Sequence, residues 1–270
     1  MVTIRTSNTH PVLVDVGMSP PNVYLDHCVI GDFSQDSALG ERFRQLLLAK
    51  RGTLCISALH LVESAGLCPG IAYSRIKDYL SSFGCNFAIL DFDPNSVVLR
   101  ERGPEISRLG APIDFELTRG LVQNWNGRST IDLGILLTLL EAHPDQVQRL
   151  RNLQSDYKTN MRSLFQGIQK EYRSNASFKE NLAKDNCLRP PESTVIEYVY
   201  CMVRRICIRQ SLSPSDAFDF FHSIVSVSYT NYVVLDRKWA DRMRNIPHVV
   251  GMSRVFATTE YSSFLDALAA

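Results

Sequence analysis

Short apolar runs alternate with amphipathic stretches in the first third of the chain, and this alternation predicts strands followed by helices. The run that begins at Val23 is rich in strand-forming residues and ends at Asp26, and two similar runs follow it. The predicted elements are strands at 23–26, 53–56 and 86–90 and helices at 37–50, 57–66 and 71–83. Strands that alternate with helices are typical of an α/β fold with a central parallel sheet covered on both faces.

The pattern changes at about residue 94, where strand signals almost vanish and helical ones accumulate. Helices are predicted there at 131–141, 145–173 and 193–210. The α/β pattern then resumes with helices at 215–228 and 237–245, strands at 232–235 and at 248–250 or 254–257, and a terminal helix from 260. We therefore divide the chain into an arm over the domain surface at 1–22 with a short strand at 12–16, a core at 23–93 and 212–270, and a mostly helical insertion at 94–211.

Composition narrows the class of protein. Hydrophobic residues make up 45% and charged residues 21% of the chain, which excludes a disordered or fibrous protein. The longest apolar stretch, 131–140, contains Asp132 and is about half the length of a membrane-spanning helix. The N-terminus lacks the apolar run of a signal peptide, so we expect a cytoplasmic protein without a membrane partner. The seven cysteines include no CxxC pair, and we expect them to be reduced and buried.

Two of the predicted strands end in a carboxylate. Asp26 follows the first strand, and Asp236 follows the strand at 232–235. Ligands of an open parallel sheet bind outside the carboxyl ends of its strands, so these acids are the first site candidates, with a turn residue as the alternative for Asp26. Glu63 lies in a short apolar helix, where a buried acid needs a partner, either a site cation or an arginine.

Further polar residues lie on the predicted helix at 215–228. Asp216, Asp219 and His222 are spaced three apart and therefore share one helix face. Asp216 falls in the first turn, where a carboxylate caps free backbone amides, so we assign it to capping and Asp219 to chemistry. We keep His222 as an additional site candidate, with support of a ligand or helix packing favoured over metal ligation.

Carboxylates gathered in one cleft repel one another and raise their own pKa values unless cations neutralise them. Ligation by oxygen alone favours Mg²⁺ or Mn²⁺ over zinc or copper. We therefore predict a divalent metal site built from Asp26, Glu63, Asp219 and Asp236. A phosphatase of the haloacid dehalogenase type would have D-x-D at the end of its first strand, whereas this chain has D-H-C.

The same acids, in the same order, resemble those of the PIN-domain nucleases. The resemblance covers about 23–90 and 213–257 and rests on Tyr24-Leu25-Asp26, Glu63, Asp219-x-x-His222 and Tyr232-Val233-Val234-Leu235-Asp236-x-x-Trp239. It implies a three-layer α/β/α fold and Mg²⁺- or Mn²⁺-dependent ribonuclease activity, with the four acids as catalytic, metal-binding residues. Glu63 and Asp219 are 156 positions apart, far more than in compact family members such as the toxin ribonucleases.

Cations follow the last of these acids directly. Arg237, Lys238 and Arg242 are expected at the rim of the cleft, and we predict that they bind the phosphate backbone of a substrate. Asp241 is a possible additional site acid, with an exposed pair with Arg237 as the simpler account. The formal net charge is +1, and leaving out four metal-neutralised acids makes it +5, which no longer argues against a nucleic-acid partner.

From these residues we predict an endoribonuclease that hydrolyses RNA phosphodiester bonds through a carboxylate-bound metal. Two alternatives stay open at this point. One is a structure-specific DNA nuclease that uses the same acids, and the other is a catalytically inactive PIN-like scaffold that binds a protein partner. The helical insertion is the expected surface for such a partner or for a second copy of the chain.

Overall fold

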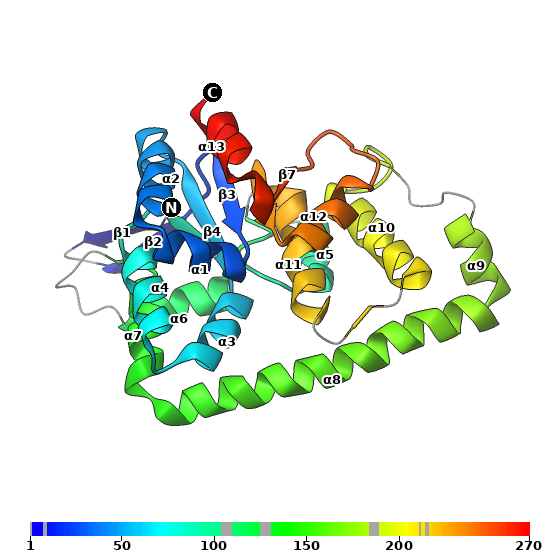
Figure 1. Ribbon diagram of the computed structural model, residues 1–270, viewed down its shortest axis with the longest axis horizontal. Helices are drawn as coiled ribbons and strands as arrows, with labels where there is room; N and C mark the ends of the chain where they lie inside the picture. The colour runs from blue at the N-terminus through cyan, green and yellow to red at the C-terminus, as the bar shows by residue number, and fades with distance from the viewer. Residues whose placement is uncertain are drawn as a thin grey trace.

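The structure is a computed structural model that describes residues 2–7, 10–103, 110–124, 131–183, 189–210, 212–213 and 216–270. Parallel strands form its central sheet in the order β5-β4-β3-β6-β7 (Figure 1). The strands are β3 (Asn22–Leu25), β4 (Thr53–Ser57), β5 (Phe87–Leu90), β6 (Tyr232–Leu235) and β7 (Arg254–Ala257). The predicted parallel sheet is confirmed, and β7 lies at the second of its two predicted positions.

Helices cover both faces of this sheet. Alternate strand residues enter two separate hydrophobic clusters, so that Val23 and Leu25 belong to one cluster and Tyr24 to the other. The first cluster includes α1 (His27–Gln35), α2 (Ser37–Ala49), α4 (Ile71–Ser81) and α13 (Tyr261–Ala269), and the second includes α10 (Val195–Arg209), α11 (Asp216–Tyr229) and α12 (Arg237–Arg244). The three layers, α/β/α, agree with the predicted fold class.

Local signals in the sequence locate most helices of the core. Ser57 is the N-cap of α3 (Ala58–Leu67), as predicted, and α2 and α4 match their predicted ranges. The exception is α1, for which no helix is predicted from the sequence. It is capped by Asp26 and buries Val29, Ile30 and Phe33. Because α1 has only nine residues and three buried positions, its periodic signal is short.

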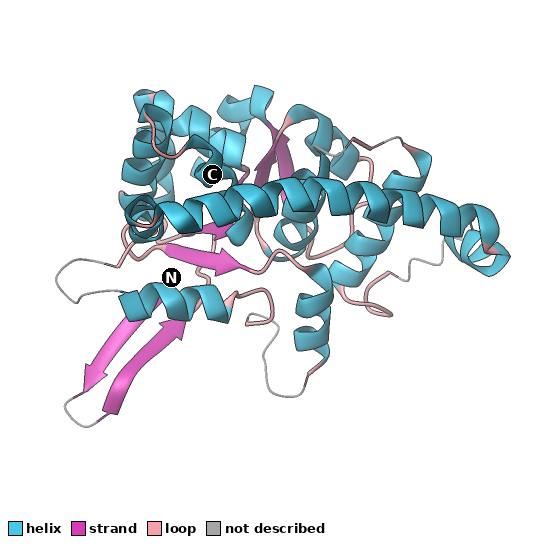
Figure 2. Ribbon diagram, turned by 90° about the horizontal axis from the view of Figure 1, so that it is seen from below, coloured by secondary structure: helices cyan, strands magenta, loops and turns pink. Residues whose placement is uncertain are grey.

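Two strands of the N-terminal segment form a separate sheet. β1 (Val2–Ser7) pairs antiparallel with β2 (His10–Val16), which contains the predicted strand at 12–16. Figure 2 shows this pair extending away from the α/β body. Pairing between the two strands satisfies backbone groups that an isolated arm would leave to water.

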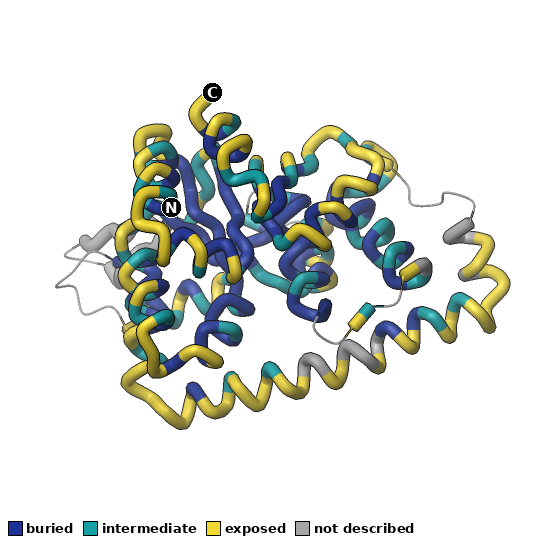
Figure 3. The backbone as a smooth tube through the Cα atoms, viewed as in Figure 1, coloured by how far each residue is buried: buried dark blue, intermediate teal, exposed yellow. Residues whose placement is uncertain are grey.

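The region 94–211 contributes helices to both sides of the sheet. Its described parts form α5 (Pro94–Arg102), α6 (Phe115–Asn124), α7 (Gly134–Ala142), α8 (Pro144–Ser174), α9 (Ala176–Ala183) and α10. The 31-residue helix α8 buries Val147 in the first hydrophobic cluster and Phe165 in the second. Its described residues between these ends are mostly exposed, so α8 bridges the two sides of the molecule (Figure 3).

The helices and the cysteines bear on two expectations drawn from the composition, the absence of a membrane-spanning helix and the presence of reduced, buried thiols. In the part of the chain that the structure describes, no helix is both long enough and apolar enough to cross a membrane. The cysteines are only partly as expected: Cys55, Cys68 and Cys207 are free and buried, but Cys28 is exposed. Cys201 is disulfide-bonded, which contradicts the expectation of reduced thiols for this residue.

Candidate metal centre

The strand order reverses between β3 and β6. From β3 the sheet extends through β4 and β5 on one side and through β6 and β7 on the other. Ligands of open α/β sheets bind at such a switch point, outside the carboxyl ends of the strands. Asp26 follows β3 at this point and Asp236 follows its parallel neighbour β6. The topology therefore brings together the two acids that the sequence places at strand ends.

Each of these acids caps the helix that follows its strand. Asp26 accepts a hydrogen bond from the His27 amide at 2.8 Å at the start of α1. Asp236 accepts hydrogen bonds from the amides of Lys238 and Trp239 at 2.7 and 3.2 Å at the start of α12. Negative charge at a helix N-terminus is stabilised by free amides and by the helix dipole. The caps fix both carboxylates in place, and in each of them the amides occupy Oδ1.

Asp219 joins these two acids from the first turn of α11. One oxygen each from Asp26, Asp219 and Asp236 lies within 4.8 Å of the others. Burial, and then the charges of Asp26 and Asp236, raise the pKa of Asp219 to about 8. Burial also raises the pKa of Asp236, against the hydrogen bonds that it accepts. The three carboxylates therefore form a group that is short of positive charge.

A divalent cation fits this group. Oδ2 of Asp236 is buried and has no hydrogen-bond partner in the described part of the chain. A buried polar atom without a partner costs free energy, and a cation among the three carboxylates would supply that partner. Since the donors are all oxygen atoms, the group suits Mg²⁺ or Mn²⁺.

Glu63 approaches the same place from α3, where it meets His222 of α11. Its Oε2 lies 3.0 Å from His222 Nε2, and that nitrogen lies 3.9 Å from Asp26 Oδ1. These three residues form a second group of closely spaced ligand atoms, which shares Asp26 with the first. Burial disfavours a charged His222, but the hydrogen bond and charge of Glu63 outweigh it and raise the His222 pKa. His222 is thus a described partner of Glu63.

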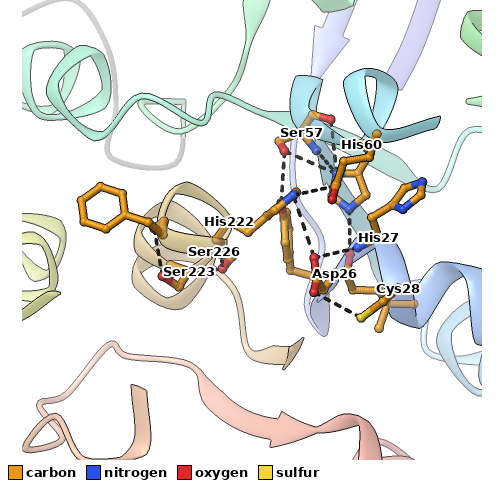
Figure 4. A network of polar contacts seen from close by, with 12 residues as sticks. Asp26, His27, Cys28, Ser57, His60, His222, Ser223 and Ser226 are labelled. Atoms are coloured by element: carbon orange, nitrogen blue, oxygen red, sulfur yellow. Dashed lines mark hydrogen bonds and ion pairs between the residues drawn. The ribbon is translucent and has the colours of Figure 1, made fainter. Parts of the chain in front are cut away.

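A buried network of polar residues lies behind His222 (Figure 4). The Tyr24 hydroxyl contacts His222 Nδ1 and lies 3.1 Å from Ser57 Oγ. His60 Nδ1 accepts the Ser57 amide at 3.0 Å, so Nε2 carries the ring proton and donates it to the Leu25 carbonyl at 2.8 Å. Burial, and then the neighbouring His222, lower the pKa of His60 to about 3, which keeps this imidazole neutral.

Tyr24 and His60 are not among the predicted site residues, although each leaves a signal in the sequence. Tyr24 stands two positions before Asp26, and residues at this spacing share one face of a strand. Ser57-x-x-His60 has the spacing of a capping box, with histidine in place of glutamate or glutamine. Both signals identify a local position and not a distant partner, so neither points to His222.

Asp216 accepts the Ser213 amide at 2.7 Å, as expected of a capping residue, and it has further partners that the sequence does not suggest. It is buried, and its carboxylate also accepts hydrogen bonds from Arg242 at 2.7 Å, Lys238 at 2.7 Å and the Trp239 indole at 3.1 Å. Burial opposes its charge, but hydrogen bonds from Lys238, Ser213 and Arg242 hold the pKa of Asp216 well below its usual range. Asp216 therefore anchors α12, the helix that Asp236 caps.

This ion cluster changes the expected substrate-binding set. Arg242 is buried against Asp216 and lies 4.8 Å from the centre of the Trp239 ring, so its guanidinium is engaged within the fold, and its contact with a substrate stays a prediction. Lys238 is half-exposed but also pairs with Asp216, whereas Arg237 is exposed. Asp241 lies outside both ligand groups among the described residues, and its carboxylate is 3.8 Å from Arg244 rather than paired with Arg237.

Comparisons of the chain with protein-family models, with curated proteins and with solved structures gave no match. The resemblance to PIN-domain nucleases therefore stays a prediction from the sequence. The fold and the geometry of the two ligand groups are the observations on which a function is proposed.

Proposed function

We propose that this chain is a metal-dependent nuclease with a PIN-like core that hydrolyses phosphodiester bonds in RNA. The observation that carries the proposal is the convergence of Asp26, Asp219 and Asp236 at the switch point of a parallel sheet. The buried oxygen of Asp236, without a partner among the described residues, and the raised pKa of Asp219 support it, because a cation bound here would pair with that oxygen and offset the repulsion between the carboxylates.

Asp26, Asp219 and Asp236 would hold Mg²⁺ or Mn²⁺, with Glu63 completing the set of carboxylates. When bound, such a cation supplies Lewis-acid stabilisation of phosphoryl oxygens and activation of water for attack on phosphorus. A cation bound to these acids would neutralise their negative charge. It would thereby reduce the electrostatic repulsion of a polyanionic substrate at this edge of the sheet. Hydrolysis of this kind is expected to leave a 5′-phosphate and a 3′-hydroxyl.

The chain's own residues supply position and charge around this centre. The helix caps of α1 and α12 hold Asp26 and Asp236, and the Asp216 cluster holds α12 against α11. His222 orients Glu63 by a 3.0 Å contact. Arg237, exposed directly after Asp236, is the cation best placed to contact a phosphate backbone.

The proposal is tested by incubating the purified protein with end-labelled RNA and DNA, each single-stranded or folded, in Mn²⁺ or in EDTA. We expect cleavage of RNA that needs Mn²⁺ and leaves 5′-phosphate ends. Metal-dependent cleavage of folded DNA alone would favour the DNA nuclease instead. Absence of cleavage of every substrate, by protein that binds Mn²⁺, would contradict the nuclease and favour the inactive scaffold.

A further inference from the structure

The two ligand groups share one residue but differ in their donor atoms. Asp26 belongs to both, so its carboxylate lies where the two groups meet. The group with Asp219 and Asp236 offers oxygen alone, whereas the group with Glu63 also offers the Nε2 nitrogen of His222. An imidazole nitrogen is a donor that transition metals prefer and Mg²⁺ does not.

The surroundings of His222 fix the direction of this nitrogen. The side chain is fully buried, and its Nε2 points toward Asp26 at 3.9 Å (Figure 4). The same nitrogen lies 3.0 Å from Glu63 Oε2. The ring packs edge-on against His60, with 4.8 Å between the ring centres. His60 is itself held at both nitrogens by the backbone, so the imidazole of His222 cannot easily rotate away.

The other nitrogen of His222 has the partner that a metal-binding histidine needs. Such a histidine donates its second ring N–H to an oxygen, which fixes the tautomer and leaves the first nitrogen free to bind the metal. The Tyr24 hydroxyl contacts Nδ1 and can accept this hydrogen bond while donating its own proton to Ser57 Oγ, 3.1 Å away. Both hydrogen bonds are buried, so this arrangement is shielded from water.

We propose that Nε2 of His222 is a direct ligand, with Asp26 and Glu63, of a second divalent cation beside the all-oxygen group, and that this position selects Mn²⁺ over Mg²⁺. The inference deepens the proposed nuclease site, but it concerns metal binding and can be tested without a substrate. It also changes the role of His222, because the sequence favours support of a ligand, whereas the geometry points to ligation itself.

Pulsed electron paramagnetic resonance of the Mn²⁺-loaded protein tests this ligand directly. A nitrogen bound to Mn²⁺ gives a ¹⁴N modulation of the electron spin echo, and we expect it in the wild type. We expect its loss in His222→Gln and its retention in His27→Gln, a control whose imidazole contacts Ser64 and belongs to neither ligand group. Incorporating ¹⁵N-histidine into the wild type should replace the ¹⁴N modulation by a ¹⁵N modulation. This labelling identifies the ligand as a histidine without any amino-acid substitution.

Calorimetric titration separates ligation from mere support of Glu63. If His222 binds the cation, His222→Gln should weaken Mn²⁺ binding by about tenfold or more and Mg²⁺ binding much less. Equal losses for the two cations, or wild-type Mn²⁺ without nitrogen modulation, would overturn the proposal. RNA cleavage by protein without that modulation would leave the proposed function standing, and nitrogen modulation in protein that cleaves nothing would support the ligand and contradict the nuclease.

Discussion

Replacing Asp236 by asparagine is expected to lower metal-dependent RNA cleavage by about a thousandfold. Asparagine caps a helix as well as aspartate does, so α12 should keep its start and the protein its fold. What the variant loses is a negative ligand at the switch point, together with the oxygen that has no partner in the described structure. A cation contributes several kcal/mol of charge stabilisation, and each ~1.4 kcal/mol is a factor of ten in rate.

Asp93→Asn is the matched control for this substitution. Asp93 also follows a strand and caps a helix, accepting the amides of Asn95 and Ser96 at 3.0 and 3.3 Å at the start of α5. It lies outside both ligand groups, so this variant should cleave RNA at the wild-type rate. Initial rates in Mn²⁺ and circular dichroism spectra of both variants provide the comparison, and a wild-type rate for Asp236→Asn would remove Asp236 from the site.

Replacing Asp219 by asparagine is expected to stabilise the metal-free protein at pH 8 and to reduce its stabilisation by metal. The pKa of Asp219 is about 8 in the folded protein, against an ordinary value of 3.8. The folded state therefore binds more protons than the unfolded state between these two values, and its stability falls as pH rises through this window. Asp236 and His222 also have raised pKa values, so they add slopes of the same sign.

Thermal unfolding in EDTA and in Mn²⁺, followed from pH 6.5 to pH 8.5, measures this effect. Below pH 6.5 the lowered pKa of His60 adds a slope of the opposite sign. In EDTA the wild-type Tm should fall as the pH rises across the measured range. The Tm of Asp219→Asn should fall less and should be several degrees higher than that of the wild type at pH 8. A chain of this size shifts its Tm by roughly 2–4 °C per kcal/mol. Asp266→Asn, which removes an exposed ion pair with Arg42, should follow the wild type. A steeper fall for Asp219→Asn than for the wild type would contradict the raised pKa.

The position of the site could be predicted from the sequence because strand ends are local features. Asp26 and Asp236 each follow a short apolar run, and a parallel sheet places the ends of such runs at one edge. Glu63 lies on α3, which follows the neighbouring strand β4, and Asp219 lies on α11, which precedes β6, so the same topology brings them near. The two hydrophobic clusters likewise follow from the apolar runs, because successive side chains of a strand point to opposite faces of the sheet and each run supplies hydrophobic residues to both faces.

The partners of these residues could not be predicted in the same way. Asp216 accepts the nearby Ser213 amide, as its neighbours in sequence suggest, but Arg242 and Trp239 reach it from another helix. His222 likewise meets Glu63 across 159 positions of sequence. Such contacts depend on how α11 packs against α3 and α12. Helix periodicity predicts the face of the helix on which a residue lies, but it does not predict which element packs against that face.

Anomalous diffraction from crystals grown with Mn²⁺ shows whether the acids at the switch point form a divalent metal centre. We predict an anomalous peak within roughly 2.0–2.6 Å of carboxylate oxygens of Asp26, Asp219 and Asp236. The same peak should be absent from crystals of Asp236→Asn grown under the same conditions. Manganese peaks found only elsewhere on the wild-type protein, with none among these three carboxylates, would contradict a metal centre at the switch point.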